Sequence, residues 1–515
     1  MVRGALGVGR SRAGSLLATL ATTGVATLLA FAINFLVTPF IAERLGAAAY
    51  GFITLASTFV GYAMIAMTAL TSYATRFVAV EYHKGNKEKA SSYVSTLVIA
   101  GAVASVALFV VLAVIALFID RLMNVPQDLV ADVKVLMLLV FTNFFVTTGG
   151  TFFSCSAYIK NKLDVYGVFQ SVSYVVEAAV LVALYVALPP HVAYFGIGLL
   201  AAGVILTVGN VHIFRRYTPD LCVRPGLFSA TDLRTLLVNG VWNSINSLGN
   251  TLHSGLDLVI VNLFLSATAM GQMAISKTFS GVFSRLFQLV SQAFQPLLLE
   301  SYTKGDRPGL LAELRVSMKL SGYISNVLFA GFFALCPAFY RLWIPGQDQE
   351  VLYVLTMLTV ACSAFEGPVN PLYFIYTLTV RNRVPCFATL IGGVLNVAGK
   401  FVLLSCTGLG VYGVALTTTV IMGLTNLVFN PLYMARCLGE RWSLFYPSLL
   451  RIALSCAGMC VVFDLVAVVM PTGGWAGFCL AAVVCALVGA AIHYAVALDG
   501  RERRAVRSRL ARKFR

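Results

Sequence analysis

The sequence predicts an all-α polytopic membrane protein with about fourteen transmembrane helices. Hydrophobic residues make up 59% of the chain, charged residues make up 11%, and the mean hydropathy is +0.86. Apolar stretches that are long enough to cross a bilayer as helices, about 20 residues each, recur along the whole length. Such continuous stretches exclude the strands of a membrane β-barrel, and the composition excludes an ordinary soluble globular protein.

Fourteen apolar stretches are expected to span the membrane. They lie at 15–42, 50–78, 91–119, 134–157, 165–188, 193–214, 235–264, 268–299, 316–340, 351–378, 384–405, 410–435, 446–470 and 475–498. The first stretch is too long for a cleaved signal peptide, and no small-residue cleavage site follows it. We therefore expect the first stretch to be a transmembrane helix.

Basic residues are distributed unevenly between the two sides that these spans define. With the N-terminus counted as cytoplasmic, 27 of the 37 Lys and Arg residues lie in cytoplasmic segments and four lie on the other side. This bias follows the positive-inside rule and predicts that both termini are cytoplasmic. It accounts for the net charge of +16 without a nucleic-acid partner, and we expect the basic tail 501–515 to contact anionic membrane lipids.

An internal repeat divides the chain. The stretch "AAAYGFITLASTFVG" at 47–61 aligns with "ATAMGQMAISKTFSG" at 267–281, and "YHKGN" at 82–86 aligns with "YTKGD" at 302–306 at the same offset. We therefore predict two six-helix lobes in the same orientation, the N-terminal lobe at 1–214 and the C-terminal lobe at 235–442, joined by a cytoplasmic linker at 215–234. The segment 443–515 adds two transmembrane helices and the tail. Two similar lobes suit transport by alternating access.

Motifs for covalent chemistry are missing from the sequence. It contains no nucleotide-binding loop or nucleophile elbow in a usable context, and its cysteines lack the spacing of metal ligands. We expect no enzymatic activity, no catalytic residue, no cofactor and no metal site. Transport is the leading class of function, and a non-transporting membrane scaffold is the alternative.

Two predicted spans carry continuous rows of polar residues along one helical face. These rows are Asn239, Asn243, Asn246, Asn250, His253 and Asp257 in one span, and Lys277, Gly281, Arg285, Gln288, Gln292 and Gln295 in the next. The second span has a milder row that ends at Arg76. The rows favour a water-filled cavity, and hydrogen bonding between helices is the alternative.

Basic residues in these rows favour an anionic ligand. Lys277, Arg285 and Arg76 are the cationic candidates, because Arg binds phosphate bidentately and Lys supplies a point charge. The predicted substrate-binding set also includes Asn243, Asn246, Asn250, Gln288 and Gln292.

Titratable residues within the spans are candidates for coupling to a proton or sodium gradient. Asp257 and His253 lie one helical turn apart, and Glu366 precedes "GPVNPLY", where Pro368 and Pro371 are expected to break the helix. Asp257 is the first candidate and Glu366 the second. If transport ignores both gradients, Asp257 is expected to be only a charge partner for a basic residue. Lys400 is expected either to face the cavity or to form a salt bridge, and the placement of Glu177 and Asp464 is left open.

The predicted arrangement of six, six and two spans resembles the multidrug/oligosaccharidyl-lipid/polysaccharide exporter superfamily. The local sequences "FIAERLGAAAYGFITLAS" and "EYHKGNKEKA" are similar to its polysaccharide flippases. The resemblance implies transport of an undecaprenyl-diphosphate-linked oligosaccharide to the outer leaflet of a bacterial inner membrane, for surface polysaccharide synthesis. It implies polysaccharide polymerase and assembly proteins as candidate partners. The peptidoglycan-precursor and multidrug-exporter branches remain alternatives, although the multidrug branch usually has twelve spans.

Overall fold

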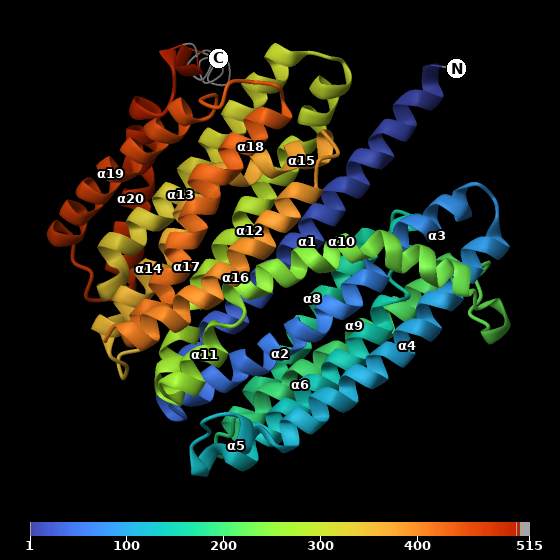
Figure 1. Cartoon of the computed structure of the whole chain (residues 1–515), viewed down its shortest axis with the longest axis horizontal. Helices are drawn as coiled ribbons and strands as arrows, with labels where there is room; N and C mark the ends of the chain where they lie inside the picture. Colours follow the sequence, from blue (N-terminus) through green and yellow to red (C-terminus); the bar gives the residue numbers. More distant parts are fainter. Residues whose placement is uncertain (1, 501, 505–515) are drawn as a thin grey trace. The chain divides into compact units, whose positions relative to one another are not determined.

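The structure is a computed structural model. It describes residues 2–500 and 502–504, with the side chains of all of these except residues 2–20 and Ser254. Every regular element in this part of the chain is helical (Figure 1). Most of the predicted basic tail 501–515 lies outside the described residues.

The chain forms two compact units. Unit 1 comprises Met1–Thr251 and Leu258–Gly271, and unit 2 comprises Leu252–Asp257 and Gln272–Arg515. The chain therefore passes between the units three times within a short segment. This division lies between residues 251 and 272, whereas the predicted lobes end at 214 and begin at 235. The two lobes therefore remain a prediction.

Unit 1 is built from long helices joined by short turns. Its elements are α1 (Val2–Arg44), α2 (Ala47–Thr71), α3 (Ala74–His83), α4 (Lys87–Leu117), α5 (Ile119–Leu122), η1 (Gln127–Leu129), α6 (Val130–Thr151), α7 (Cys155–Ile159), α8 (Leu163–Ala187), α9 (Ala193–Tyr217), η2 (Pro225–Leu227) and most of α10 (Ala230–Ser254) and α11 (Asp257–Phe264). Small residues allow close helix packing: a Cβ on Gly196 of α9 would lie 2.7 Å from the Cβ of Leu139 on α6.

Unit 2 contains most of α12 (Ala267–Thr303) and all elements after it. These are α13 (Arg307–Trp343), α14 (Gln349–Val369), η3 (Asn370–Tyr373), α15 (Phe374–Leu378), α16 (Arg383–Cys406), α17 (Gly410–Leu424), the π-helical turn η4 (Thr425–Phe429), α18 (Asn430–Cys437), α19 (Tyr446–Val469) and α20 (Trp475–Val496). Helix α13 packs against α14, α19 and α20. The buried core at one end of the unit includes Leu314, Leu372 and Phe445.

Twelve segments in the described part of the chain are long and apolar enough to span a membrane. They correspond to twelve of the fourteen predicted spans, and they confirm an all-α polytopic membrane protein. The predicted seventh and eighth spans are helical as α10, α11 and α12, but they do not reach the same hydropathy. The rows of Asn, Gln and charged residues cause this difference, because each polar side chain lowers the mean hydropathy of its helix.

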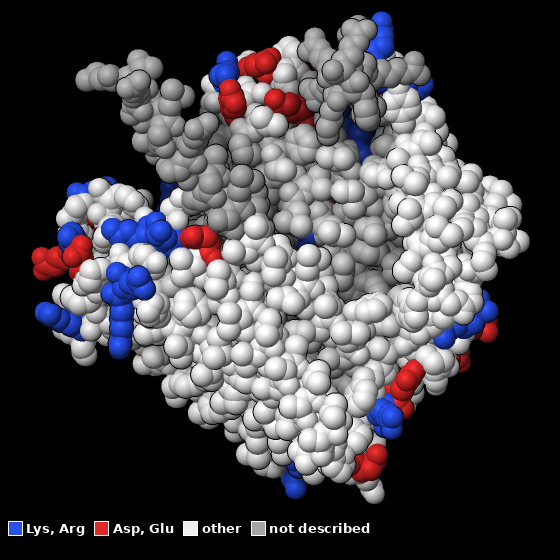
Figure 2. Space-filling model, turned by 180° about the vertical axis from the view of Figure 1, so that it is seen from behind, with Lys and Arg blue, Asp and Glu red and all other residues white. Residues whose placement is uncertain are grey.

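Figure 2 shows that the described charged side chains gather in small groups, whereas most of the described surface in this view is uncharged. Within unit 1, the Lys87 ammonium lies 2.7 Å from the Asp220 carboxylate, and His191 Nδ1 lies 3.0 Å from Asp132. Each contact joins two segments that the charge count assigns to the same side of the membrane. The contacts within the unit therefore agree with the predicted alternation of sides.

Candidate functional site

The helix in the predicted seventh span is interrupted beside its acidic residue. Helix α10 ends at Ser254 and α11 begins at Asp257, so the backbone around Gly255 leaves the helical hydrogen-bond pattern. The His253 carbonyl oxygen instead accepts a hydrogen bond from Asn396 Nδ2 at 2.6 Å and one from Lys400 Nζ at 3.3 Å. Thr418 Oγ1 also lies 3.5 Å from this oxygen. The break thus creates a polar centre that α16 and α17 complete.

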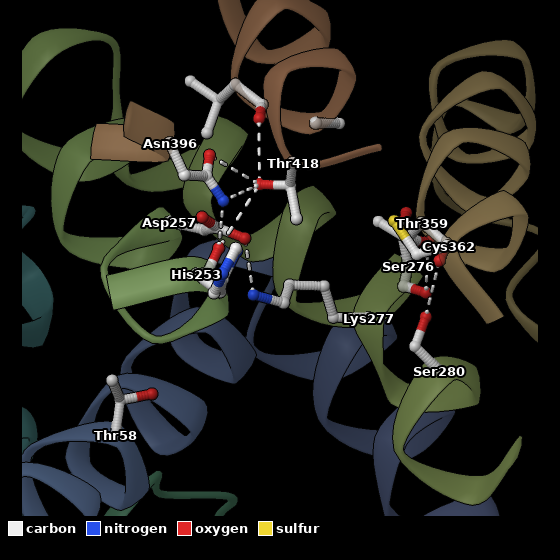
Figure 3. Close-up of polar contacts among 12 residues, drawn as sticks. Thr58, His253, Asp257, Ser276, Lys277, Ser280, Thr359, Cys362, Asn396 and Thr418 are labelled. Atoms are coloured by element: carbon white, nitrogen blue, oxygen red, sulfur yellow. Dashed lines mark hydrogen bonds and ion pairs between the residues drawn. The ribbon is translucent and has the colours of Figure 1, made fainter. Parts of the chain in front are cut away.

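Asp257 lies at this centre and binds two ammonium groups. Its Oδ2 lies 2.7 Å from Lys277 Nζ of α12, and its Oδ1 pairs with Lys400 Nζ of α16. The side chains of Asp257 and Lys400 are buried, whereas 23% of the Lys277 side chain is exposed. Figure 3 shows Asp257, His253, Lys277, Asn396 and Thr418 directed toward one another. We call Asp257, Lys277, Lys400 and His253 the Asp257 cluster, and all four belong to unit 2.

A second polar contact joins α12 and α14. Ser280 donates a hydrogen bond to the Thr359 carbonyl at 3.2 Å, and Thr359 Oγ1 donates to the Ser276 carbonyl at 3.3 Å (Figure 3). One turn further along, Glu366 accepts hydrogen bonds from Ser284 Oγ at 3.4 Å and from Asn370 Nδ2 at 3.1 Å. Among the described residues, no basic side chain forms an ion pair with Glu366.

The expected helix break near Glu366 occurs later than predicted. Helix α14 continues through Pro368 to Val369, and the chain then forms the 3-10 turn η3, which contains Pro371. The prediction was therefore wrong for Pro368 and right for Pro371. Pro368 cannot donate a backbone hydrogen bond to the residue four positions earlier, and α14 ends one residue after it.

The first polar row is divided between the units: its four asparagines lie in unit 1, whereas His253 and Asp257 lie in unit 2 with the second row. Asn239, Asn243, Asn246 and Asn250 are exposed on the part of α10 that lies in unit 1, whereas Arg285, Gln288 and Gln292 are exposed on α12 in unit 2. Arg76 is exposed on α3, because α2 ends at Thr71 and a turn separates the two helices. Among the described predicted site residues, Asp257 and Lys277 form an ion pair, and His253 is linked to Asp257 through Lys400, which contacts both.

Lys400 is the member of the cluster that the sequence pattern did not place. Its predicted salt-bridge alternative is confirmed, since it is fully buried and paired with Asp257. The spacing of Asn396 and Lys400, one turn apart on α16, was the available signal, but nothing in the sequence joined them to the predicted seventh span. Glu177 is buried in α8 and Asp464 is exposed on α19.

Comparison with known proteins identifies the family. The family described as "Polysaccharide biosynthesis protein" matches residues 16–300. The chain is also 30% identical over 420 residues to the uncharacterized membrane protein EpsK of Bacillus subtilis (strain 168), covering 82% of this chain and 83% of EpsK. The chain belongs to the polysaccharide biosynthesis protein family. This result confirms the resemblance to the polysaccharide branch of the exporter superfamily.

Solved structures show that this member of the polysaccharide biosynthesis protein family shares its fold with membrane transporters. One is the lipid II flippase MurJ in its inward closed conformation. The alignment covers 92% of this chain and 98% of the MurJ chain, with a TM-score of 0.66 and 14% sequence identity. Another is a multidrug resistance MATE family transporter in an inward-facing conformation. The alignment covers 82% of this chain and 98% of the transporter chain, with a TM-score of 0.60 and 12% sequence identity. At these identities the likeness concerns the fold alone.

Proposed function

We propose that this protein is a flippase for an anionic lipid-linked oligosaccharide of the undecaprenyl-diphosphate type. It would act by alternating access in the bacterial inner membrane, with both termini in the cytoplasm, and would serve surface polysaccharide synthesis. Membership of the polysaccharide biosynthesis protein family supports the broad role, and the transporter fold supports the mode of action.

The binding of two ammonium groups by one carboxylate in the Asp257 cluster supports the choice of an anionic substrate. One carboxylate faces two lysines, and Arg285 is exposed two turns further along α12. At the position of Asp257, a site for cationic drugs would be expected to present a carboxylate without ammonium partners instead. A phosphate group is attracted by Lys277 as a point charge and by Arg285 as a planar bidentate donor. The predicted amides Gln288 and Gln292 lie on the same helix and are suited to sugar hydroxyls.

For coupling, the geometry favours Glu366 over Asp257. Both carboxylate oxygens of Asp257 bind ammonium groups, so a coupling ion would have to compete with two lysines. Glu366 has only neutral hydrogen-bond partners among the described residues. We therefore treat Asp257 as a charge partner and Glu366 as the residue that exchanges an ion.

The test is the leaflet distribution of lipid-linked oligosaccharide in cells that lack the gene. We expect the intermediate to accumulate in the cytoplasmic leaflet and surface polysaccharide to be lost. The wild-type gene should restore both, and a Lys277→Ala, Arg285→Ala double variant should not, although its membrane abundance should be normal. Lys304→Ala is the matched control. Lys304 is an exposed lysine just after the end of α12, and it pairs with the exposed Glu300. Full complementation by the double variant would refute the anionic site.

Peptidoglycan lipid precursor transport is the second candidate, because the fold aligns with that of the lipid II flippase over nearly the whole chain. The same cells distinguish the two functions. Accumulation of the peptidoglycan precursor in the cytoplasmic leaflet, with surface polysaccharide intact, would favour this candidate.

A further inference from the structure

In the Asp257 cluster, one carboxylate binds the ammonium groups of two lysines. The two lysines of Asp257 differ in their surroundings: 23% of the Lys277 side chain is exposed, whereas the Lys400 side chain is fully enclosed. The Lys277 side chain is therefore partly exposed at the surface of the unit, whereas the Lys400 side chain is not.

Lys400 is held in place by more than one oxygen atom. It pairs with Asp257 Oδ1 and donates to the His253 carbonyl at 3.3 Å. That carbonyl also accepts from Asn396, which lies one turn before Lys400 on α16. The broken backbone between α10 and α11 thus fixes both the carboxylate and the buried ammonium. Lys277 reaches the same carboxylate from a different helix, α12, through the other oxygen.

We propose that Lys277 exchanges Asp257 for a phosphate oxygen of the substrate, and that Lys400 is the positioning residue that permits this exchange. The proposal rests on the function proposed above. When Lys277 leaves, Lys400 stays on Asp257, so the buried carboxylate is never without a counterion. No ion from solution is needed to neutralise Asp257 during this step.

The physical reason is the cost of a buried unpaired charge. Removing one partner of a buried ion pair is strongly unfavourable, because the remaining charge is desolvated and uncompensated. Without Lys400, Lys277 would be the sole ammonium group on Asp257. Its departure would then leave the Asp257 carboxylate buried without a counterion, which is unfavourable. Lys277 would then stay on Asp257 and bind phosphate poorly. Replacing Asp257 by a neutral residue would release Lys277, and replacing Lys400 as well would leave no uncompensated buried charge in the cluster.

Binding of a short isoprenyl diphosphate to the purified full-length protein in detergent tests the exchange. Farnesyl diphosphate is the probe, farnesol is the uncharged control, and calorimetry gives the dissociation constants. We expect Lys277→Met and Lys400→Met each to weaken binding at least about tenfold, the effect of one charge-assisted hydrogen bond. Asp257→Asn should bind more tightly than the wild type. The Lys400→Met, Asp257→Asn double variant should regain at least about tenfold over Lys400→Met alone.

Lys319→Met is the matched control, because Lys319 is a buried lysine of the same unit that pairs with Asp499 and Glu502 and lies outside the Asp257 cluster. It should bind the probe as the wild type does. If Lys400 had a purely structural role, replacing Asp257 as well would not restore binding of farnesyl diphosphate. A double variant that binds no better than Lys400→Met therefore overturns the exchange. If Lys400→Met does not fold, the Asp257→Asn variant decides alone, and weaker binding by that variant overturns the proposal.

The outcomes also separate this inference from the proposed function. Failure of the wild type to bind farnesyl diphosphate more tightly than farnesol would overturn both. Tight binding by the wild type and equally tight binding by Lys400→Met would overturn the exchange alone and leave the anionic substrate site in place.

Discussion

At the scale of single residues, the two carboxylates singled out by the sequence have different surroundings. Asp257 is held by Lys277 and Lys400, whereas Glu366 is held by a serine hydroxyl from α12 and an asparagine amide from η3. A carboxylate whose partners are neutral can gain or lose a proton without breaking an ion pair. This difference is the basis for assigning Asp257 to charge balance and Glu366 to coupling.

Replacing Glu366 by Gln should abolish the response of transport to a proton gradient. The amide keeps the size of the side chain and its contacts with Ser284 and Asn370, but it cannot release a proton. The measurement is flipping of a labelled lipid-linked oligosaccharide by reconstituted protein, with and without an imposed pH gradient. Asp464→Asn, which alters an exposed acid on α19, is the control and should respond like the wild type. An unchanged response of Glu366→Gln would show that Glu366 carries no coupling proton.

Two pairs of repeat-related glycines provide a second prediction at this scale. A Cβ on Gly271 would lie 2.0 Å from the Ala47 carbonyl oxygen, and a Cβ on Gly51 would lie 2.9 Å from the Gly271 Cα, whereas a Cβ on Gly61 or Gly281 would meet nothing within 4 Å. Gly271→Ala should therefore lower the free energy of unfolding of unit 1 by about 1–3 kcal/mol through overpacking. Thermal unfolding, followed by labelling of the buried thiol of Cys155, measures this loss. Gly281→Ala should show none, and equal unfolding temperatures for the two variants would contradict the close helix contact.

At the scale of elements, the predicted cytoplasmic linker is anchored to α4 rather than free. Ser95 Oγ donates to the Cys222 carbonyl at 3.2 Å, and Thr96 Oγ1 accepts from the Ser229 backbone at 3.0 Å. Asp232, at the start of α10, is buried and lies 2.6 Å from Lys89 Nζ. The linker is therefore an integral part of unit 1.

Replacing Asp232 by Ala should destabilise unit 1 by about 1–3 kcal/mol, the cost of leaving hydrogen-bonding groups around a buried site without their partner. The unfolding temperature in detergent, followed at Cys155, measures the loss. Asp220→Ala is the control in the same linker and should change little, because its pair with Lys87 is exposed. The Lys87 ammonium holds the pKa of the Asp220 carboxyl below its usual range, so this pair is present at neutral pH and is lost as the pH falls through the lowered pKa. Similar losses for both variants would contradict the anchoring role of Asp232.

The elements also show how far the sequence alone could go. Hydropathy predicted the helices, and the three-and-four spacing of polar residues was enough to place His253, Asp257 and Lys277 in polar rows. That spacing could not predict that α10 stops at Ser254, because the interruption depends on Asn396 and Lys400, which lie more than a hundred residues later. Helical periodicity describes one element at a time, and contacts between distant elements are outside its reach.

At the scale of the whole molecule, the charge bias and the contacts within each unit support one topology. In unit 2, the Arg307 guanidinium lies 2.8 Å from Glu440, so two segments assigned to the cytoplasm contact one another. Lys319, near the start of the predicted span 316–340, lies 2.6 Å from Glu502 of the segment that is also assigned to the cytoplasm. Phe339 and Trp475 lie 6.2 Å apart between ring centroids, near segments that are assigned to the outside. A wrong assignment of a single span within 91–214 or 316–498 would place such partners on opposite faces of the membrane.

Cysteine labelling in intact cells tests this topology. The background variant carries Ser in place of the exposed Cys406 and Cys479. Cysteines introduced at Lys84 and Gly226 should be protected from a membrane-impermeant maleimide until the cells are opened, whereas cysteines at Gln127 and Gly346 should react at once. All four positions are exposed, so lack of reaction reports the side of the membrane rather than burial. Tags within 3–12 and 501–515 should behave like the first pair, and those within 189–192 like the second. A reactive C-terminal tag together with a protected N-terminal tag would require an odd number of spans, which two six-helix repeats and two added helices cannot provide.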